Sequence, residues 1–155
     1  MARSVHTTDS PLGQTAGMAP CTFCAIVAGD VAADFVYDDE AVVGFLDRSP
    51  LFKGHVLVVP RAHVPTLMEL PADAVAPFFA VVQRVASVLP RALDAHGTFV
   101  AINNVVSQSV PHLHAHVVPR RRKDGLRGFF WPRDRYTDAA EVVEFASRIR
   151  LALDG

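Results

Sequence analysis

Three histidines occupy every second position of the stretch SVPHLHAHVVPR, which runs from Ser109 to Arg120. A period of two is typical of a β-strand, where residues i, i+2 and i+4 point to the same side. Three neighbouring imidazoles repel one another when protonated, so this row indicates a function more than an accident of composition. The row, which consists of His112, His114 and His116, is a candidate metal site or catalytic site, and the residues between its members suit a buried face.

Cys21 and Cys24 form a second candidate site, with the spacing C-x-x-C. In a reducing compartment this spacing suggests metal binding or redox chemistry. Because these are the chain's only two cysteines, a four-ligand zinc site would need two histidines as well. From the residues alone the candidates are His55, His63 and one member of the histidine row. Two buried thiols without a ligand remain an alternative.

The elements that must position these residues follow from hydrophobic periodicity. Short strands are expected over residues 35–37, 42–46, 55–60, 98–103 and 110–119. A long helix is expected over residues 70–97, and a closing helix over 137–153 with Thr137 as its N-cap. The buried stripe of the long helix is predicted to contain Val75, Phe78, Val82, Val85, Leu89 and Leu93. These elements predict an α+β fold, a five-stranded antiparallel sheet with one long helix and a C-terminal helix.

Length and composition set limits on the class of protein. The chain has 155 residues and a net charge of −1, so one domain is expected and a polycation that binds nucleic acid is not. No run approaches the roughly 18 apolar residues of a membrane span. Residues 1–19 are expected to be a disordered leader before a single domain over 20–155. The absence of a signal peptide makes a cytoplasmic location the expectation.

The sequence HLHAHVV resembles the signature of the histidine-triad family of nucleotide hydrolases and transferases, His-x-His-x-His followed by two apolar residues. The segments CTFCAI, FLDRSPLFKGHVLVVPRAH and QSVPHLHAHVVPR also stand in family order, so the resemblance covers roughly Cys21 to Arg120. It implies a HIT-like fold, a homodimer and an AMP-like purine nucleotide as substrate. Nucleoside phosphoramidates and dinucleoside polyphosphates are the substrate classes expected.

The resemblance also implies roles for individual residues. His114 would be the nucleophile that attacks the α-phosphorus and forms a nucleotidyl-histidine, which water then hydrolyses. Neutral imidazole is nucleophilic near pH 7, so it suits this role. His116 and Ser109 would hold phosphate oxygens and the leaving group. Asp47 would accept hydrogen bonds from both ribose hydroxyls.

The remaining substrate contacts are also implied by the resemblance. Phe23, Ile26 and Phe45 fall where the family packs the base, although plain core packing is the alternative for each. Arg48 lies on the base side. The phosphates would meet Asn103, or its neighbour Asn104, and the loop to Gln108. His55 is expected to line the site or to cap its strand.

Members of the family's zinc-bearing branch use a C-x-x-C pair, a later histidine and the first histidine of the triad. The resemblance therefore implies a structural zinc ion on Cys21, Cys24, His63 and His112. Such a metal would hold His112 unprotonated beside His114.

Residues 120–136, RRRKDGLRGFFWPRDRY, carry seven Lys or Arg and two Asp. This segment is either a clamp for an anionic leaving group, with Trp131 as a lid, or a solvated loop with aromatic anchors. At the level of the whole chain, an enzyme that uses a nucleotidyl-histidine is favoured by the intact triad. A nucleotide-binding or regulatory module with little turnover is the alternative, and a catalytic metal on all three triad histidines is a weaker one.

Overall fold

The computed structural model describes residues 21–126 and 135–153. These residues fall into two units, one that ends at Arg122 and one that begins at Lys123, and each unit is described by itself. The leader expected over residues 1–19 lies outside the described residues. The single domain expected over 20–155 stays a prediction.

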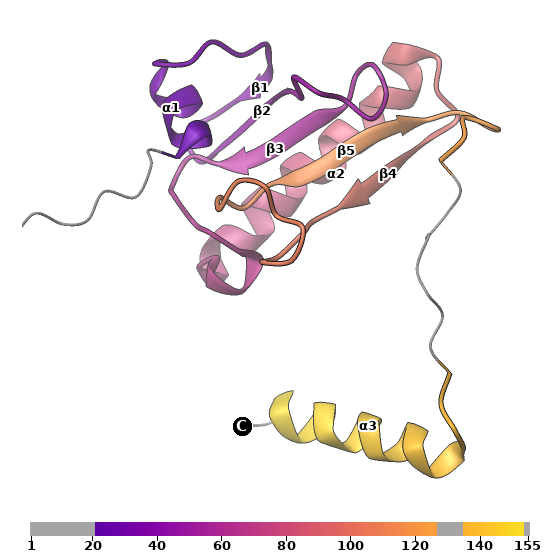
Figure 1. The fold of residues 1–155 in the computed structure, drawn as a ribbon. Coiled ribbons are helices and arrows are strands. Elements are labelled where there is room, and N and C mark those ends of the chain that lie inside the picture. Colours follow the sequence, from indigo (N-terminus) through magenta and orange to yellow (C-terminus); the bar gives the residue numbers. More distant parts are fainter. Residues whose placement is uncertain (1–20, 127–134, 154–155) are drawn as a thin grey trace, which may run out of the picture. The chain divides into compact units, whose positions relative to one another are not determined.

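The first unit is built on a five-stranded antiparallel sheet (Figure 1). In spatial order its strands are β1 (Phe35–Asp38), β2 (Val42–Leu46), β3 (Val56–Pro60), β5 (Ala115–Arg120) and β4 (Gly97–Ala101). Every pair of neighbours is antiparallel. The predicted α+β class and the five-stranded antiparallel sheet are confirmed, and the expected strands differ from the observed ones mainly at their ends.

The two faces of the sheet bury different partners, because side chains alternate along each strand. Helix α2 (Ala72–Leu93) packs with Val56, Val58 and Val117 on one face. The short helix α1 (Thr22–Ala28) inserts Phe23 and Ile26 against the other residues of β2 and β3. Those strand residues are Val43, Phe45, Leu57 and Val59. The sheet therefore separates a large core under α2 from a smaller core under α1.

Helix α2 is shorter than expected and its buried stripe differs slightly. It ends at Leu93 because Asp94 takes a left-handed backbone conformation, with φ 51°. Val75, predicted to be buried, is 38% exposed, and Val81 is buried in its place. Among the described helices, α2 is the one long and apolar enough to cross a membrane by those two criteria alone. A helix that packs on the core of a globular fold passes the same test, and Phe78, Val82 and Leu89 of α2 are buried.

The histidine stretch is only partly a strand, which corrects the prediction for residues 110–119. Strand β5 begins at Ala115, so His112 and His114 precede it and only His116 belongs to it. The reason is a tertiary contact: the Leu113 N–H donates to the Val64 carbonyl at 2.6 Å, a partner outside the ladder. The alternation nevertheless continues, because Leu113, Ala115 and Val117 all join the α2 core.

The second unit contains helix α3 (Ala139–Leu153), which confirms the predicted C-terminal helix. Its N-cap is Asp138 rather than Thr137, because the Glu141 N–H donates to the Asp138 carboxylate at 2.9 Å. The Thr137 hydroxyl donates to the Glu141 carboxylate at 2.9 Å instead. None of the described residues of α3 is buried within the unit.

Candidate functional site

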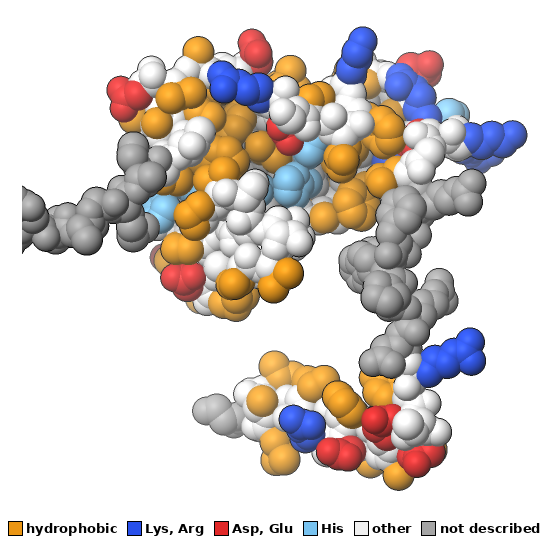
Figure 2. Space-filling view, viewed as in Figure 1, with side chains coloured by type: hydrophobic (Ala, Val, Ile, Leu, Met, Phe, Trp, Pro, Cys, Tyr) orange, Lys and Arg blue, Asp and Glu red, His pale blue; other side chains and the backbone are white. Residues whose placement is uncertain are grey.

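The strand register places the triad on the α1 face of the sheet. His116 lies opposite Leu57, and Leu57 lies opposite Phe45, so these three side chains share a face. Because the residues between the histidines point toward α2, His114 follows His116 to the same side. Figure 2 shows histidine side chains, in pale blue, at the middle of one face of this unit with hydrophobic side chains around them.

His114 is held in one orientation by the backbone. Its side chain is 3% exposed, and its Nδ1 lies 2.6 Å from the carbonyl oxygen of His112. A carbonyl only accepts, so the proton of the neutral ring is on Nδ1 and the lone pair is on Nε2. The rings of Phe23 and His116 meet it edge to face, at centroid distances of 5.2 and 4.9 Å. The result is a fixed imidazole with a nucleophilic nitrogen.

A second group joins Asp47, His55 and His116, and we call it the Asp/His cluster. Nε2 of His55 lies 3.0 Å from Nδ1 of His116. Nδ1 of His55 lies 3.3 Å from the Asp47 carboxylate and accepts the Leu51 N–H, also at 3.3 Å. The sequence predicted only that His55 lines the site or caps its strand. In the structure the His55 ring contacts the ring of His116.

Burial lowers the pKa of three histidines, His55, His112 and His116. Desolvation, with smaller contributions from His114 and His55, lowers the pKa of His116 to about 4. Desolvation also lowers the pKa of His55, although the Asp47 carboxylate opposes this effect, and it lowers the pKa of His112. At neutral pH each of these three rings therefore carries one proton, and its hydrogen-bond partners decide which nitrogen holds it.

A cavity of about 520 Å³, which we call the nucleoside cavity after the contacts predicted for it, lies between α1 and β2. Its lining includes Phe23, whose ring meets that of His114, and Asp47 of the Asp/His cluster. It brings together five of the residues predicted to contact a nucleoside: Phe23, Ile26, Phe45, Asp47 and Arg48. Each of the three apolar residues is less than 10% exposed and belongs to the α1 core, so core packing is confirmed for them, and their contact with a base stays a prediction. The mainly apolar walls and the carboxylate suit a flat ring with a hydroxylated sugar.

Asp47 is oriented by its neighbours. One carboxylate oxygen accepts the Ser49 N–H at 2.8 Å, and the other lies beside His55. Its side chain is 21% exposed, so it reaches solvent at the cavity. A fixed carboxylate at this edge can accept hydrogen bonds from a diol.

The loop after β4 separates the two asparagines that the sequence left undecided. The Asn104 side-chain oxygen accepts the Leu67 N–H at 2.8 Å, so Asn104 ties the loop to the chain before α2. The Asn103 amide makes a longer bond, 3.3 Å, to the Ser107 carbonyl. Asn103 is therefore the more available of the two for a ligand.

Gln108 has a structural role that its predicted substrate contact did not include. Its amide donates to the Pro65 carbonyl at 2.6 Å and its oxygen accepts the Val105 N–H at 2.9 Å. Both ends of the side chain are thus engaged within the protein. These bonds hold a loop in which Val105 and Ser107 adopt left-handed backbone conformations, with φ 65° and 61°.

Ser109 lines a second cavity, of about 780 Å³, together with Cys21, Cys24 and His63. The described lining of the nucleoside cavity includes neither Ser109 nor the triad histidines. The predicted contact of Ser109 with phosphate therefore stays a prediction.

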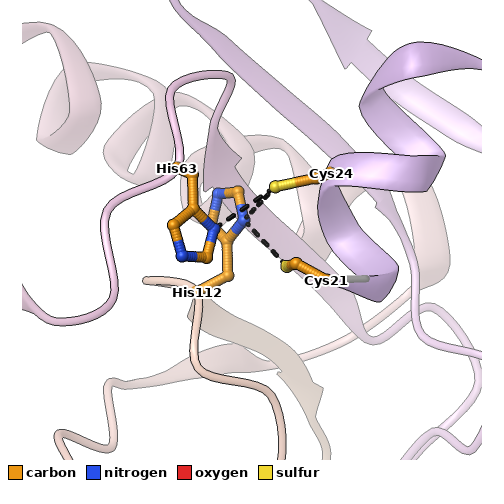
Figure 3. A group of neighbouring side chains, drawn as sticks. All are labelled: Cys21, Cys24, His63 and His112. Carbon is orange, nitrogen blue, oxygen red and sulfur yellow. Dashed lines mark hydrogen bonds between the residues drawn. The ribbon is translucent and has the colours of Figure 1, made fainter. Parts of the chain in front are cut away.

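Cys21, Cys24, His63 and His112 converge in a group that we call the Cys/His cluster (Figure 3). Nδ1 of His112 lies 3.4 and 3.6 Å from the two sulfur atoms, and Nδ1 of His63 lies 3.3 Å from that of Cys24. Two thiols come from the start of α1, one histidine follows β3 and one precedes β5. All four predicted ligands therefore meet, and sulfur with imidazole is the donor set that zinc prefers.

A buried backbone contact prepares His112 for this cluster. Its Nε2 lies 2.8 Å from the Pro60 carbonyl and must carry the proton, so the lone pair on Nδ1 faces the sulfur atoms. Burial raises the pKa of the Cys24 thiol, and the neighbouring Cys21 raises it further. A bound cation would reverse this effect by favouring the thiolate. The donors fit a divalent metal in both position and protonation.

The basic segment 120–136 is only partly described. The guanidinium of Arg121 donates to the Leu93 and Asp94 carbonyls, so this residue closes the end of α2. Residues 127–134, which include Trp131, lie outside the described residues. The two interpretations of the whole segment stay open, but Arg121 has a structural contact.

Sequence reasoning missed the backbone partners of the histidines. The carbonyls of Pro60 and His112 and the N–H of Leu51 fix three different rings. Side-chain identity does not encode a backbone group, and the Pro60 contact spans 52 positions. The other two partners are close in the chain, but their contact depends on the backbone conformation between them and not on residue type.

Comparisons with known proteins found a matching family and several relatives. The HIT domain matches residues 28–123, which is more than half of the chain. An uncharacterised HIT-like protein of Mycobacterium tuberculosis is 39% identical over 69% of this chain and 76% of its own length. The adenosine 5'-monophosphoramidase hnt1 of Schizosaccharomyces pombe is 32% identical over 72% of this chain and 83% of its own length. The adenylylsulfatase HINT3 of Arabidopsis thaliana is 32% identical over 68% and 55%.

Solved structures give the same result. The protein SMU.412c of Streptococcus mutans superposes with a TM-score of 0.80 at 35% identity, over 99% of each chain. A zinc-bound histidine triad family protein of Mycobacterium smegmatis has a TM-score of 0.66 at 38% identity, over 88% of this chain and 98% of its own. With its fold, its three histidines on the α1 face and the matched domain, the chain belongs to the HIT family.

Proposed function

We propose that the chain is a hydrolase that cleaves a phosphorus bond of an AMP-like nucleotide through a nucleotidyl-histidine at His114. The observation that carries this proposal is the 2.6 Å contact between Nδ1 of His114 and the His112 carbonyl, which leaves Nε2 as a fixed nucleophile beside the nucleoside cavity. Two relatives, a phosphoramidase and an adenylylsulfatase, are named for different groups attached to adenylate. They support hydrolysis at the α-phosphorus with a variable leaving group.

The steps balance with groups that the site holds. Nε2 of His114 attacks the α-phosphorus, a new N–P bond forms, and the bond from phosphorus to the leaving group breaks. The leaving group departs with the electron pair of that bond, either as a neutral amine if its nitrogen is already protonated or as an anion that takes a proton from solvent. Water then attacks the same phosphorus and releases a proton to solvent, the N–P bond breaks, and AMP leaves with His114 restored.

Orientation comes from the surrounding residues. Asp47 accepts from the ribose hydroxyls, while Phe23, Ile26 and Phe45 enclose the base. Asn103 and His116 bind phosphate oxygens and the leaving group. The Cys/His cluster holds a zinc ion that contributes stability, because its four donors surround one point away from the nucleoside cavity.

Two further expectations belong to this proposal. The chain acts in the cytoplasm as a homodimer, and the apolar surface that Phe79 of α2 and Val100 of β4 expose is the candidate interface. Light scattering at micromolar concentration measures the oligomeric state directly. A monomer at that concentration would contradict the dimer without affecting the chemistry.

The experiment that tests the function is to trap the intermediate. Purified protein is mixed with AMP phosphoramidate, quenched in alkali and analysed by intact mass. We expect a nucleotidyl adduct that acid removes, because a phosphoramidate is acid-labile and a serine ester is not. The His114→Ala variant is the matched control and should carry no adduct. Nucleotide binding without adduct or turnover in the wild type would favour the regulatory alternative.

A further inference from the structure

His55 is a buried histidine outside the triad, with a side chain that is 3% exposed. The residue before it is Gly54, which has a φ of +92°. A Cβ added to Gly54 would meet the side chain of Leu93 of α2. The positive φ is the reason that glycine suits this position, because the end of the Leu93 side chain could move aside for a Cβ. The His55 ring itself is held by the hydrogen bonds of its two nitrogens.

The first nitrogen of His55, Nδ1, has a backbone donor. The Leu51 N–H donates to it at 3.3 Å, and a backbone N–H cannot accept. The Asp47 carboxylate lies at ion-pair distance from the same nitrogen, 3.3 Å, but among the described contacts only the Leu51 N–H has the geometry of a hydrogen bond to it. The neutral ring of His55 thus carries its proton on Nε2.

The second nitrogen of His55, Nε2, is the donor to His116. Nε2 of His55 lies 3.0 Å from Nδ1 of His116, so the first donates and the second accepts. A neutral imidazole has one N–H, and Nδ1 of His116 is already an acceptor. The proton of His116 must be on its own Nε2.

We propose that His55 is a positioning residue that transmits the hydrogen-bond direction of the Leu51 amide to His116 and makes Nε2–H of His116 a fixed donor. The inference rests on the proposed function, in which His116 faces the phosphate and the leaving group. It specifies that His116 stabilises developing negative charge as a neutral donor, without giving up its proton. A preorganised donor of this kind needs no rearrangement during the reaction.

If the hydrogen bonds from Leu51 through His55 to His116 ran in the opposite direction, His116 would have the opposite role. If Nδ1–H of His55 donated to Asp47, Nε2 of His55 would accept from His116, and Nε2 of His116 would become a base for the hydrolytic water. The two directions differ in the position of one proton on each ring. A measurement of tautomers therefore distinguishes them.

The direct test is long-range ¹H–¹⁵N correlation NMR on the ¹⁵N-labelled full chain, with zinc bound, at neutral pH. The spectra report for each ring which nitrogen carries the proton. We expect the Nε2–H form for His55 and His116, and the Nδ1–H form for His114. An Nδ1–H form of His116 in the wild type would overturn the inference, and this reading requires no variant to fold.

Three substitutions at one position then test transmission. His55→Gln retains a donor toward His116 and should keep the Nε2–H form with most of the rate. His55→Leu has no donor and should lower kcat on the order of 10²-fold, with a mixed tautomer at His116. His55→Glu presents only acceptors when ionised and should invert His116 to the Nδ1–H form. His96→Gln, at an exposed histidine remote from the site, is the matched control and should leave both readouts unchanged.

The result separates two failures. If the wild type forms the His114 adduct but His55→Leu leaves the His116 tautomer and kcat unchanged, only the inference about His55 is wrong. If the wild type forms no adduct, the proposed function fails, whatever the tautomers are. A purely structural role for His55 would lower the melting temperatures of the variants without the opposite tautomers of His116 that glutamine and glutamate should produce.

Discussion

The Cys/His cluster and the Asp/His cluster hold similar side chains at similar distances. In each, ligand-type atoms lie within 4.8 Å of one another, and each takes one histidine from the triad stretch. Their hydrogen bonds differ. In the Cys/His cluster the proton of His112 points away, toward the Pro60 carbonyl, and its lone pair faces two thiols. In the Asp/His cluster the rings of His55 and His116 face each other across a hydrogen bond.

Under the proposed function, this difference would give neighbouring histidines separate tasks. Lone pairs that converge on one point bind a cation, whereas a lone pair that meets an N–H is already satisfied. A backbone group outside each cluster determines which case applies. His112 is therefore prepared for metal, and His116 is prepared as a hydrogen-bond donor.

The largest effect is expected at His114, which stands between the two clusters. His114→Ala should lower turnover on the order of 10⁴-fold or more, because it removes the covalent route itself. Binding of AMP should stay nearly intact, since the ribose and base contacts come from other elements. Single-turnover kinetics and calorimetric titration with AMP measure the two quantities. Near-normal turnover in this variant, with Ser109→Ala inactive, would make Ser109 the nucleophile.

A smaller loss is expected from the Asp/His cluster. His116→Ala should lower kcat on the order of 10² to 10³-fold, as for one lost donor to a developing charge. The adduct at His114 should still form, only more slowly. Quenched-flow measurement of adduct formation checks this result, and a loss as large as that in His114→Ala would show that His116 is itself essential to the covalent step.

The Cys/His cluster should affect stability more than chemistry. Zinc at 100 to 1,000 times its Kd should raise the free energy of unfolding by about 2.7 to 4.1 kcal/mol over the metal-free protein. In Cys21→Ser this difference should vanish, because one of four donors no longer offers a thiolate. Elemental analysis and urea unfolding with and without chelator give the comparison. Metal-free wild type with unchanged unfolding would rule out a structural metal.

The smallest effect is a pH dependence of stability. His116 has a folded pKa of about 4 against an ordinary 6.5, so the unfolded chain binds more protons between these values. The free energy of unfolding should therefore rise with pH from about 4 to 6.5. The contribution of the neutral His116 ring is lost as the pH falls through that window. The slope per histidine stays below about 1.4 kcal/mol per pH unit. Urea unfolding across this range should show a shallower slope in His116→Asn, and an equal slope would contradict it.

Much of the architecture follows from local pattern. Alternation and helical periodicity indicated all five strands and both long helices, since those signals depend on residues close together in the chain. The signature HLHAHVV and the C-x-x-C pair likewise marked both candidate sites, and the resemblance to the zinc-bearing branch of the family implied the four proposed metal ligands. The same patterns misplaced the start of β5 and the N-cap of α3, because a single tertiary or capping hydrogen bond shifts an end by a few residues.

The sequence by itself determined which residue types the site contains and on which side of a chain segment they fall. Tertiary structure alone decided how they are used. It tied Gln108 and Asn104 to the loop, and it divided the triad between two clusters. It also oriented the rings of His112 and His116 through partners 52 and 61 positions away in the chain. The physical reason is that a hydrogen-bond direction depends on where backbone N–H and carbonyl groups lie in the folded chain, and every residue type except proline offers both.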